Sequence, residues 1–379
     1  MKRRVAMGAV VAALAGLVTA GGPALAEAGS EETAACATGP TVLETLPPAG
    51  TGRYGDDGVH ALGRPGVAVG VSAGLPVYWT GTRVHEVPMP EGYDRGFLKD
   101  VNKRGTAVGR LSGPSGRALF GYRLGAPSVQ LLSEGGAIGR GGGAAVNDAG
   151  YIAAVGADGT PRVWRKGAVV RELPLPADAG SGTSVRGIAG INARGDVLGH
   201  AVRTEDADEG FVYGENPVVW PGDGGPAKSL PVAVSEWLAH NTPTGIDSEG
   251  RVVGTFSATD RFNPVEKPWH WAVPYEDTGS SPGLLRGFGQ GGFSAISPTT
   301  NVSVGTARSY GEEVPWTPSR AQYWPGRGPL LALPGLAPGR DSEAWAVSDD
   351  DRVGGVASPE SWGFQPVIWH CAGKQAYRP

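Results

Sequence analysis

The stretch GINARGDVLGH, residues 190–200, decides the fold because its pattern recurs along the whole chain. From Ile191 it has the form apolar, polar, two variable positions, Gly, variable, apolar, variable, Gly. Asn can hydrogen-bond its own backbone in a tight turn, and Gly accepts the positive φ that such a turn needs. The stretch therefore predicts a β-hairpin whose two strands flank the turn at 192–195.

Seven copies of this pattern run through the sequence. VNKRGTAVG and IDSEGRVVG are clear copies, and LGRPGVAVG and VSDDDRVGG are degenerate ones. The copies lie 39 to 55 residues apart, which is close to the length of a propeller blade. Their first residues, the blade anchors, are Leu62, Val101, Val146, Ile191, Ile246, Ile296 and Val347.

Two further signals follow each hairpin. A short apolar run ends in an aromatic residue, and a run rich in Leu and Pro often comes next, such as ELPLP at 172–176. Together with the hairpin they predict four strands per unit, an arrangement typical of propeller blades. The aromatic residues are Trp79, Phe120, Trp164, Trp220, Trp271, Trp324 and Trp369.

The residue before each anchor indicates a closed ring. It is Ala or Gly in six copies and Asp100 in the other. Small residues are expected where innermost strands converge on a central channel, whereas a solenoid would not force such crowding. We therefore predict an all-β, seven-bladed propeller that occupies residues 27–379 as a single, monomeric domain.

The two ends of the chain supply a closure. The last unit stops after its third strand at Trp369, and TVLETLPP at 41–48 resembles a fourth strand. Pairing the two would leave no exposed sheet edge. Cys36 and Cys371, the only cysteines, flank these segments. In an exported protein they predict one disulfide, with a free thiol nucleophile as the alternative.

The first 26 residues predict export. Lys2–Arg4 is a basic segment, Val5–Ala20 is apolar, and Ala24-Leu25-Ala26 is a cleavage site of small residues. This is the pattern of a secretory signal peptide that is removed after Ala26. A retained membrane anchor is the alternative, but the apolar run is short for a span. No later segment is apolar enough to span a bilayer, so we expect a secreted protein.

Composition limits the class of partner and of fold. The net charge is −4 and the sequence holds no basic run, so nucleic acid and anionic membrane surfaces are excluded as partners. The 63 Gly and 32 Pro residues argue against long helices. The 11 Trp residues argue against disorder.

These repeats resemble those of the HAF-repeat extracellular proteins. That family combines an aliphatic-Trp run, a Leu-rich run and an Ile-Asn-x-x-Gly-x-Val-Val-Gly segment, and the likeness covers essentially the whole mature chain. The chain departs from the family in the His-Ala-Phe triplet, for which PVVW at 217–220 stands as an example. The resemblance implies an exported β-repeat protein and supplies no catalytic residue.

Several short motifs have simpler explanations. GVSAG at 70–74 matches a nucleophile elbow, but no helix follows Ser72, as that chemistry requires. The Arg194-Gly195-Asp196 adhesion tripeptide falls in the repeat's tight turn. The histidines show no metal-binding spacing, and the acidic runs at 349–351 and 204–210 lack the calcium-loop pattern. We therefore predict no catalytic residue, metal or cofactor, and leave calcium binding open.

Polar residues recur five or six positions before the anchors, at the mouth of the predicted channel. The longer loops of the same face carry aromatic residues, which suits binding. We predict a non-catalytic binding site for an extracellular glycan, peptide or small anion, and arginine suits the anion. The alternative is a propeller lyase, cyclase or hydrolase with its site at the channel mouth. The candidate residues are Asp57, Arg95, Arg140, Arg186, His240, Asn241, Gln290, Asp341, Trp316 and Trp362.

Overall fold

The computed structural model describes Cys36 and residues 38–47, 57–135, 143–204, 212–233, 239–260, 263–309, 318–359 and 363–379. Cys36–Pro379 forms one compact unit. The signal peptide predicted at 1–26 lies outside the described residues. Within them, no helix is long and apolar enough to cross a membrane.

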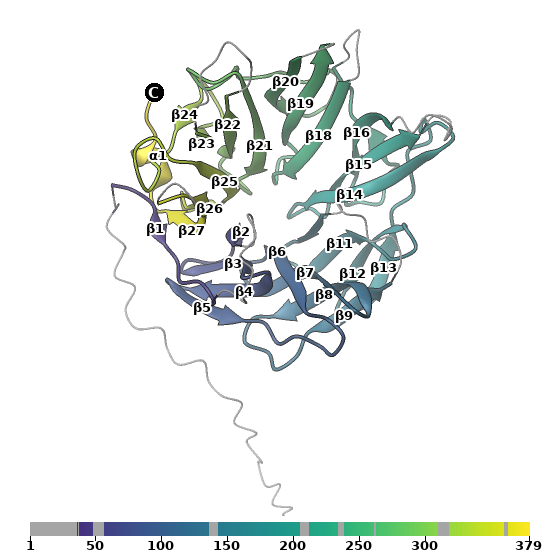
Figure 1. The fold of residues 1–379 in the computed structure, drawn as a ribbon. Coiled ribbons are helices and arrows are strands. Elements are labelled where there is room, and N and C mark those ends of the chain that lie inside the picture. The colour runs from purple at the N-terminus through teal and green to yellow at the C-terminus, as the bar shows by residue number, and fades with distance from the viewer. Residues whose placement is uncertain are drawn as a thin grey trace, which may run out of the picture. The chain divides into compact units, whose positions relative to one another are not determined.

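Seven antiparallel sheets stand around a central axis, which confirms the seven-bladed propeller (Figure 1). Blade 1 contains β2 (Gly58–Leu62), β3 (Val67–Ser72), β4 (Leu75–Thr80) and β5 (Arg83–Glu86). Blade 2 contains β6 (Arg95–Val101), β7 (Thr106–Gly113), β8 (Gly116–Arg123) and β9 (Gln130–Glu134). Blade 3 contains β10 (Ala144–Val146), β11 (Tyr151–Val155), β12 (Pro161–Arg165) and β13 (Ala168–Glu172).

The remaining blades follow in sequence order. Blade 4 contains β14 (Thr183–Ile191), β15 (Val197–Thr204), β16 (Val212–Trp220) and β17 (Lys228–Ser229). Blade 5 contains β18 (Ala239–Ile246), β19 (Val252–Asp260) and β20 (Asn263–Trp271). Blade 6 contains β21 (Gln290–Ile296), β22 (Ser303–Arg308), β23 (Arg320–Trp324) and β24 (Leu331–Ala332). Blade 7 contains β25 (Ser342–Val347), β26 (Val353–Ala357), β27 (Gln365–Trp369) and β1 (Thr41–Val42).

Every predicted anchor is the last residue of an innermost strand, at the point where the predicted hairpin turn begins. Two details differ from the prediction. Blade 5 has three strands in the described residues, and only Ser280, which bridges His270, stands in the place of a fourth. The segment after Trp271 is rich in Gly, Pro and Ser and has no β-branched run to form a longer strand.

The aromatic residue of blade 2 is the second difference. Tyr122 pairs with Ala107, just as Trp220 pairs with Val197 in blade 4. Tyr122 therefore holds the position of the tryptophans, rather than Phe120. Phe120 lies two residues earlier on the same face of β8, and both side chains are buried.

The asparagine of the repeat caps its own turn. The Oδ1 atom of Asn192 accepts hydrogen bonds from the backbone N–H groups of Arg194 and Asp196, each at 3.0 Å. Gly195 in the same turn has φ of 85°, which a residue with a side chain rarely adopts. The hairpin is thus stabilised by residues within the repeat itself.

The same asparagine also joins neighbouring blades. The Nδ2 atom of Asn102 donates to the Asn147 carbonyl at 2.9 Å, and that of Asn147 donates to the Asn192 carbonyl at 3.0 Å. Asn192 in turn donates to the Asp247 carbonyl at 2.9 Å. These side chains are buried, so each hydrogen bond satisfies groups that water does not reach. Blades 2 to 5 are connected by this relay.

At the seam between blades 7 and 1, the hydrogen bond between neighbouring blades comes from Arg352. Its Nη2 atom donates to the carbonyl of Gly63, the residue of blade 1 at the asparagine position, at 2.8 Å. Arg352 is only 5% exposed, and its Nε atom pairs with Asp350 at 2.8 Å. A buried arginine thus donates to the next blade in place of an asparagine, because blade 7 has Ser348 at the asparagine position.

The tryptophan of one blade forms a hydrogen bond with the Leu-rich run of the blade before it. The indole N–H of Trp220 donates to the carbonyl of Pro174 in the preceding blade at 2.6 Å, next to the buried Leu173. Trp271 binds the Pro231 carbonyl at 2.9 Å and Trp369 the Pro334 carbonyl at 2.7 Å. In these three cases a buried Leu precedes the acceptor, namely Leu173, Leu230 or Leu333.

The N-terminal segment completes blade 7 as predicted. Thr41 pairs with Ile368 and Val42 with Val367, so β1 is the outermost strand of this sheet. The indole of Trp79 in blade 1 donates to the Glu44 carbonyl at 2.8 Å, which is the same kind of contact that Trp220, Trp271 and Trp369 make. The segment therefore supplies both a fourth strand and the acceptor for blade 1.

The Cys36–Cys371 disulfide is present, with a Cα–Cα distance of 5.5 Å across 335 residues of sequence. It lies at the junction between β1 and the end of β27. Beyond it, α1 (Ala372–Gln375) leads to Tyr377, which forms an isolated bridge with Ala332 of blade 6. The C-terminal tail thus contacts the outer edge of a neighbouring blade.

We predict that replacing both cysteines, Cys36→Ser with Cys371→Ser, lowers the free energy of unfolding by about 2–5 kcal/mol, because the open chain gains conformational freedom when unfolded. Urea unfolding followed by tryptophan fluorescence measures the loss. The wild-type protein in reductant is the control and should match the double variant. Equal unfolding midpoints for oxidised wild type and variant would contradict the closing role of the bridge.

The double role of Asn147 gives a second test. Asn147→Asp keeps an oxygen for the turn but loses the donor to blade 4, whereas Asn147→Ala loses both. We expect losses of unfolding free energy of about 1–3 kcal/mol for Asp and about 2–4 kcal/mol for Ala. The exposed Asn216 on β16 provides the control, since Asn216→Asp should change stability by less than about 0.5 kcal/mol. An Asn147→Asp variant as stable as wild type would show that the relay contributes nothing.

Candidate functional site

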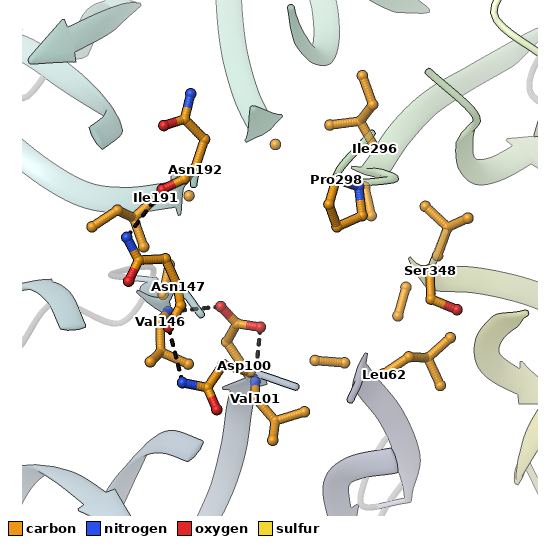
Figure 2. A pocket seen from close by; sticks show the side chains of 18 of the residues that line it. Leu62, Asp100, Val101, Val146, Asn147, Ile191, Asn192, Ile296, Pro298 and Ser348 are labelled. Atoms are coloured by element: carbon orange, nitrogen blue, oxygen red, sulfur yellow. Dashed lines mark hydrogen bonds between the residues drawn. The ribbon is translucent and has the colours of Figure 1, made fainter. Parts of the chain in front are cut away.

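A cavity of about 280 Å³ lies on the propeller axis. Its wall is formed by the last residues of the innermost strands and by the hairpin turns that follow them. Figure 2 shows anchors such as Leu62, Val101 and Ile191 around this cavity. The wall is therefore a ring of aliphatic side chains, between which polar residues are inserted.

The polar residues in the wall come from a β-bulge that recurs in the innermost strands. In six of the seven innermost strands the described register shifts at the residue two positions before the anchor. A bulge leaves one residue unpaired and redirects its side chain. The exception is β10, which begins at this position with Ala144 in regular register. The six unpaired residues, all of which line the cavity, are His60, Lys99, Ala189, Thr244, Ser294 and Trp345.

The large and charged side chains among these six residues lie on one side of the channel. Trp345, His60 and Lys99 lie on three consecutive blades, 7, 1 and 2; we call them the Trp–His–Lys cluster. The other blades contribute only alanine or a hydroxyl at the same position. One side of the channel thus carries an aromatic ring, an imidazole and an ammonium group, and the other side leaves open space.

His60 is held as a neutral ring. Its Nδ1 atom lies 2.9 Å from the Leu98 carbonyl, which only accepts, so Nδ1 carries the proton and Nε2 remains an acceptor. Burial lowers the pKa of His60 from 6.5 to about 4, and the charge of Lys99 adds to this effect. The ring centroid lies 5.7 Å from that of Trp345 and 5.5 Å from that of Phe97. Aromatic neighbours and one backbone carbonyl therefore fix its position.

Trp345 is positioned by two contacts. Its indole N–H donates to the Glu343 carboxylate at 3.1 Å. Its ring lies against the backbone of Gly58, where an added Cβ would stand 2.2 Å from the nearest ring atom. Gly58 is therefore needed for the close approach, and the half-buried indole forms a rigid part of the wall.

Lys99 is the cation of the cluster. Its side chain lines the cavity and is exposed, and desolvation in the channel lowers the pKa of its ammonium group, against which the charge of Asp100 acts. Asp100 itself spans the seam between blades 2 and 3, because its two oxygens accept from the N–H groups of Val101 and Val146, each at 2.8 Å (Figure 2). Burial raises the pKa of Asp100 to about 6 despite these bonds. Lys99 has no ion pair within the described part of the chain.

Two more carboxylates line the cavity, among the turns. Asp349 pairs with Lys103 at 3.4 Å and accepts the Thr299 N–H at 2.7 Å. Asp148 accepts the Lys103 N–H at 2.9 Å. Asp148 thus binds a donor of the neighbouring blade 2, and Asp349 binds donors of the neighbouring blade 6 and of blade 2.

Two sequence candidates support loops. Asp57 accepts from the Ser72 hydroxyl at 2.6 Å and from the Ala73 N–H at 2.9 Å. Asp341 accepts from the N–H and the hydroxyl of Ser319 at 2.7 and 2.8 Å. Ser72 itself is fully buried and also accepts the Leu46 N–H at 2.9 Å, so GVSAG is structural and presents no exposed nucleophile.

The other described candidates lie at the starts of innermost strands. Arg95 and Arg186 are exposed, His240 is half-buried, and Asn241 and Gln290 are buried. Asn241 donates to the Ala233 carbonyl at 3.1 Å. None of these described residues lines the cavity. Arg140, Trp316 and Trp362 lie outside the described residues.

Strand direction separates these candidates from the cavity. Arg95 begins β6 and Asp100 lies near its other end, about 17 Å away at the usual rise per residue. The Trp–His–Lys cluster was missed because the repeat does not fix the position two before the anchor. The variation at that position, from alanine to tryptophan, is the signal that could have revealed it.

The adhesion tripeptide has a structural role. Arg194 and Asp196 of the adhesion tripeptide form an ion pair with each other at 2.6 Å, and Asp196 also accepts the Gly222 N–H at 2.8 Å. The turn is thus internally bonded. In the described ranges no group of three or more His, Cys, Asp or Glu side chains is placed to hold a metal ion.

Three solved structures that this chain resembles share between 10% and 14% of its sequence. No family model and no curated protein matches this chain. An oligogalacturonate lyase in complex with manganese is 10% identical and has a TM-score of 0.49, over 90% of this chain and 97% of that one. The WD40 β-propeller domain of Doa1 is 14% identical with a TM-score of 0.47, over 87% and 97%. The tricorn protease is 11% identical with a TM-score of 0.48, over 83% of this chain but only 35% of the protease.

Proposed function

We propose that this protein is an exported binding propeller that holds a small ligand in its central channel, at the end where the hairpin turns lie. The observation that carries the proposal is the Trp–His–Lys cluster on the wall of a 280 Å³ cavity. An apolar wall with a few convergent polar groups is the usual composition of a small-molecule site. The aliphatic anchors provide that wall, and the bulged residues provide the polar groups.

The state of the polar groups supports binding rather than catalysis. A general acid or base must be free to exchange a proton with the substrate. Both oxygens of Asp100 accept backbone N–H groups, and the Nδ1 atom of His60 is engaged with a carbonyl. The Nε2 atom of His60 is free to accept, but burial lowers the pKa of this ring to about 4, which makes it a weak base. These groups therefore suit hydrogen bonding to a ligand better than proton transfer.

A propeller enzyme of the lyase, cyclase or hydrolase type is the second candidate. It is favoured by the lowered pKa of Lys99 next to the raised pKa of Asp100, since such shifts are typical of catalytic sites. Conversion of a bound ligand into product would favour this candidate over binding alone.

Export remains part of the proposal. The Cys36–Cys371 disulfide supports it, because disulfides persist in oxidising compartments. The signal peptide and membership of the HAF-repeat family remain predictions.

A channel-filling variant tests the proposed site. Ser294 lines the cavity at a bulge position, and Ser294→Trp should occupy the space opposite Lys99. In a thermal-shift screen of neutral, anionic and cationic small molecules, we expect compounds that stabilise the wild type but not this variant. A ligand at about 100 times its Kd adds about 2.7 kcal/mol to the free energy of unfolding.

The exposed Ser229 on β17 provides the matched control, because Ser229→Trp should leave ligand stabilisation unchanged. Equal stabilisation of wild type and Ser294→Trp would place the ligand outside the channel. The absence of any stabilising compound would also contradict the proposal.

A further inference from the structure

We propose that the ligand of the channel is a small polyhydroxylated carboxylate, whose carboxylate group binds Lys99 and whose ring or chain packs on Trp345. This inference rests on the proposed function and specifies its ligand. The argument proceeds from the charges on the channel wall, then from the shape of the cavity, and finally from its hydrogen-bonding groups.

The charges of the wall favour an anionic group at Lys99. The carboxylates that line the cavity all bind donors of the protein: Asp100 and Asp148 accept backbone N–H groups, and Asp349 pairs with Lys103. Lys99, in contrast, has only Asp100 as a nearby opposite charge, and the oxygens of that carboxylate already serve two backbone groups. A ligand carboxylate would form the ion pair that Lys99 does not make with any described residue.

The environment of Lys99 strengthens this argument. Lys99 lines the cavity and its side chain is exposed, so a ligand in the channel can reach the ammonium group. A charge-assisted hydrogen bond from an ammonium to a carboxylate is about twice as strong as a neutral one. Binding of a carboxylate would therefore stabilise the charged form of Lys99.

The shape of the cavity sets the size of the ligand. At about 280 Å³ it lies just below the ~300–1,000 Å³ typical of sites for drug-sized molecules. Ala189 of blade 4 lies across the channel from His60 of blade 1 and has only a methyl group as its side chain. The immobile Trp345 indole offers a flat surface at the edge of the cavity. A single sugar-sized molecule meets these limits.

The remaining polar groups suit hydroxyls. His60 offers Nε2 as an acceptor, because its Nδ1–H binds the Leu98 carbonyl. The Thr244 hydroxyl donates to the Phe293 carbonyl at 2.9 Å, so its oxygen accepts from a ligand. Ser294 provides a third hydroxyl-bearing position on the wall. Acceptors around one ammonium group are complementary to an acid that also carries several hydroxyl groups.

Three sugars of equal size and different charge provide the test: glucuronate, glucose and glucosamine. Isothermal titration calorimetry on the full mature protein should give an affinity for glucuronate at least about tenfold above that for glucose, as one charge-assisted hydrogen bond implies. Glucosamine should bind no better than glucose. Preference for glucosamine would overturn the inference, because it would mean that the three carboxylates dominate the channel.

Variants assign the preference to Lys99. Lys99→Gln should reduce the affinity for glucuronate to that for glucose, while Lys228→Gln, on the exposed outer strand β17, should leave both unchanged. Trp345→Leu should weaken glucuronate and glucose by the same factor, since it removes packing and not charge. Near-UV circular dichroism confirms that each variant is folded.

The salt dependence of glucuronate binding to wild type gives a readout that needs no variant. Affinity for glucuronate should fall with added sodium chloride while that for glucose stays constant. If none of the three sugars binds but other compounds stabilise the wild type and not Ser294→Trp, the carboxylate inference fails and channel binding stands. If no compound distinguishes those two proteins, both proposals fail.

Discussion

Seven innermost strands must meet around one axis, and the rest of the structure follows from this constraint. The position before each anchor is therefore small, with Asp100 as the exception, and the anchors themselves fill the channel wall. The strands accommodate the convergence with a bulge at one shared position. Because a bulge turns an extra side chain out of the ladder, the same packing constraint that closes the ring also presents residues to the channel.

The ring is held together by residues that the repeat already needs for its turns and cores. Asn102, Asn147 and Asn192 each cap a hairpin through oxygen and bind the next blade through nitrogen. The strand-three tryptophans fill the blade cores, and Trp220, Trp271 and Trp369 bind carbonyls of the preceding blade. Local and long-range contacts therefore depend on the same few side chains, and such agreement between levels favours a single native structure.

Where the repeat ends, other groups complete the ring. β1 supplies the missing strand, Glu44 supplies the carbonyl for Trp79, and Arg352 supplies the donor for Gly63. The disulfide then ties the two ends of the chain at this blade. The polar cluster lies beside the closure, since Trp345, His60 and Lys99 belong to blades 7, 1 and 2. Side chains at the seam have thus diverged most from the repeat.

The sequence was sufficient for the blade count, the anchors, the closing strand and the disulfide, because each depends on periodicity or on what the last unit lacks. It was insufficient for blade 5, whose fourth strand is reduced to the bridge at Ser280. It also placed the aromatic of blade 2 at Phe120, since a spacing in sequence does not give the pairing register that selects Tyr122.

The candidate site was harder to predict than the fold. The bulge depends on how seven strands converge, and no local pattern in the sequence encodes it. His60, Lys99 and Trp345 therefore had no motif, while the recurring polar residues near the strand starts did. Of these, Asp57 and Asp341 recur because loops need acceptors for their hydroxyl and N–H groups.

A crystal structure of the mature protein soaked with glucuronate tests the central claim most directly. The predicted result is a sugar acid in the channel, with its carboxylate about 2.7–2.9 Å from the Nζ atom of Lys99 and its ring against Trp345. A sugar acid bound instead at the opposite ends of the innermost strands, beside Arg95 or Arg186, would contradict it.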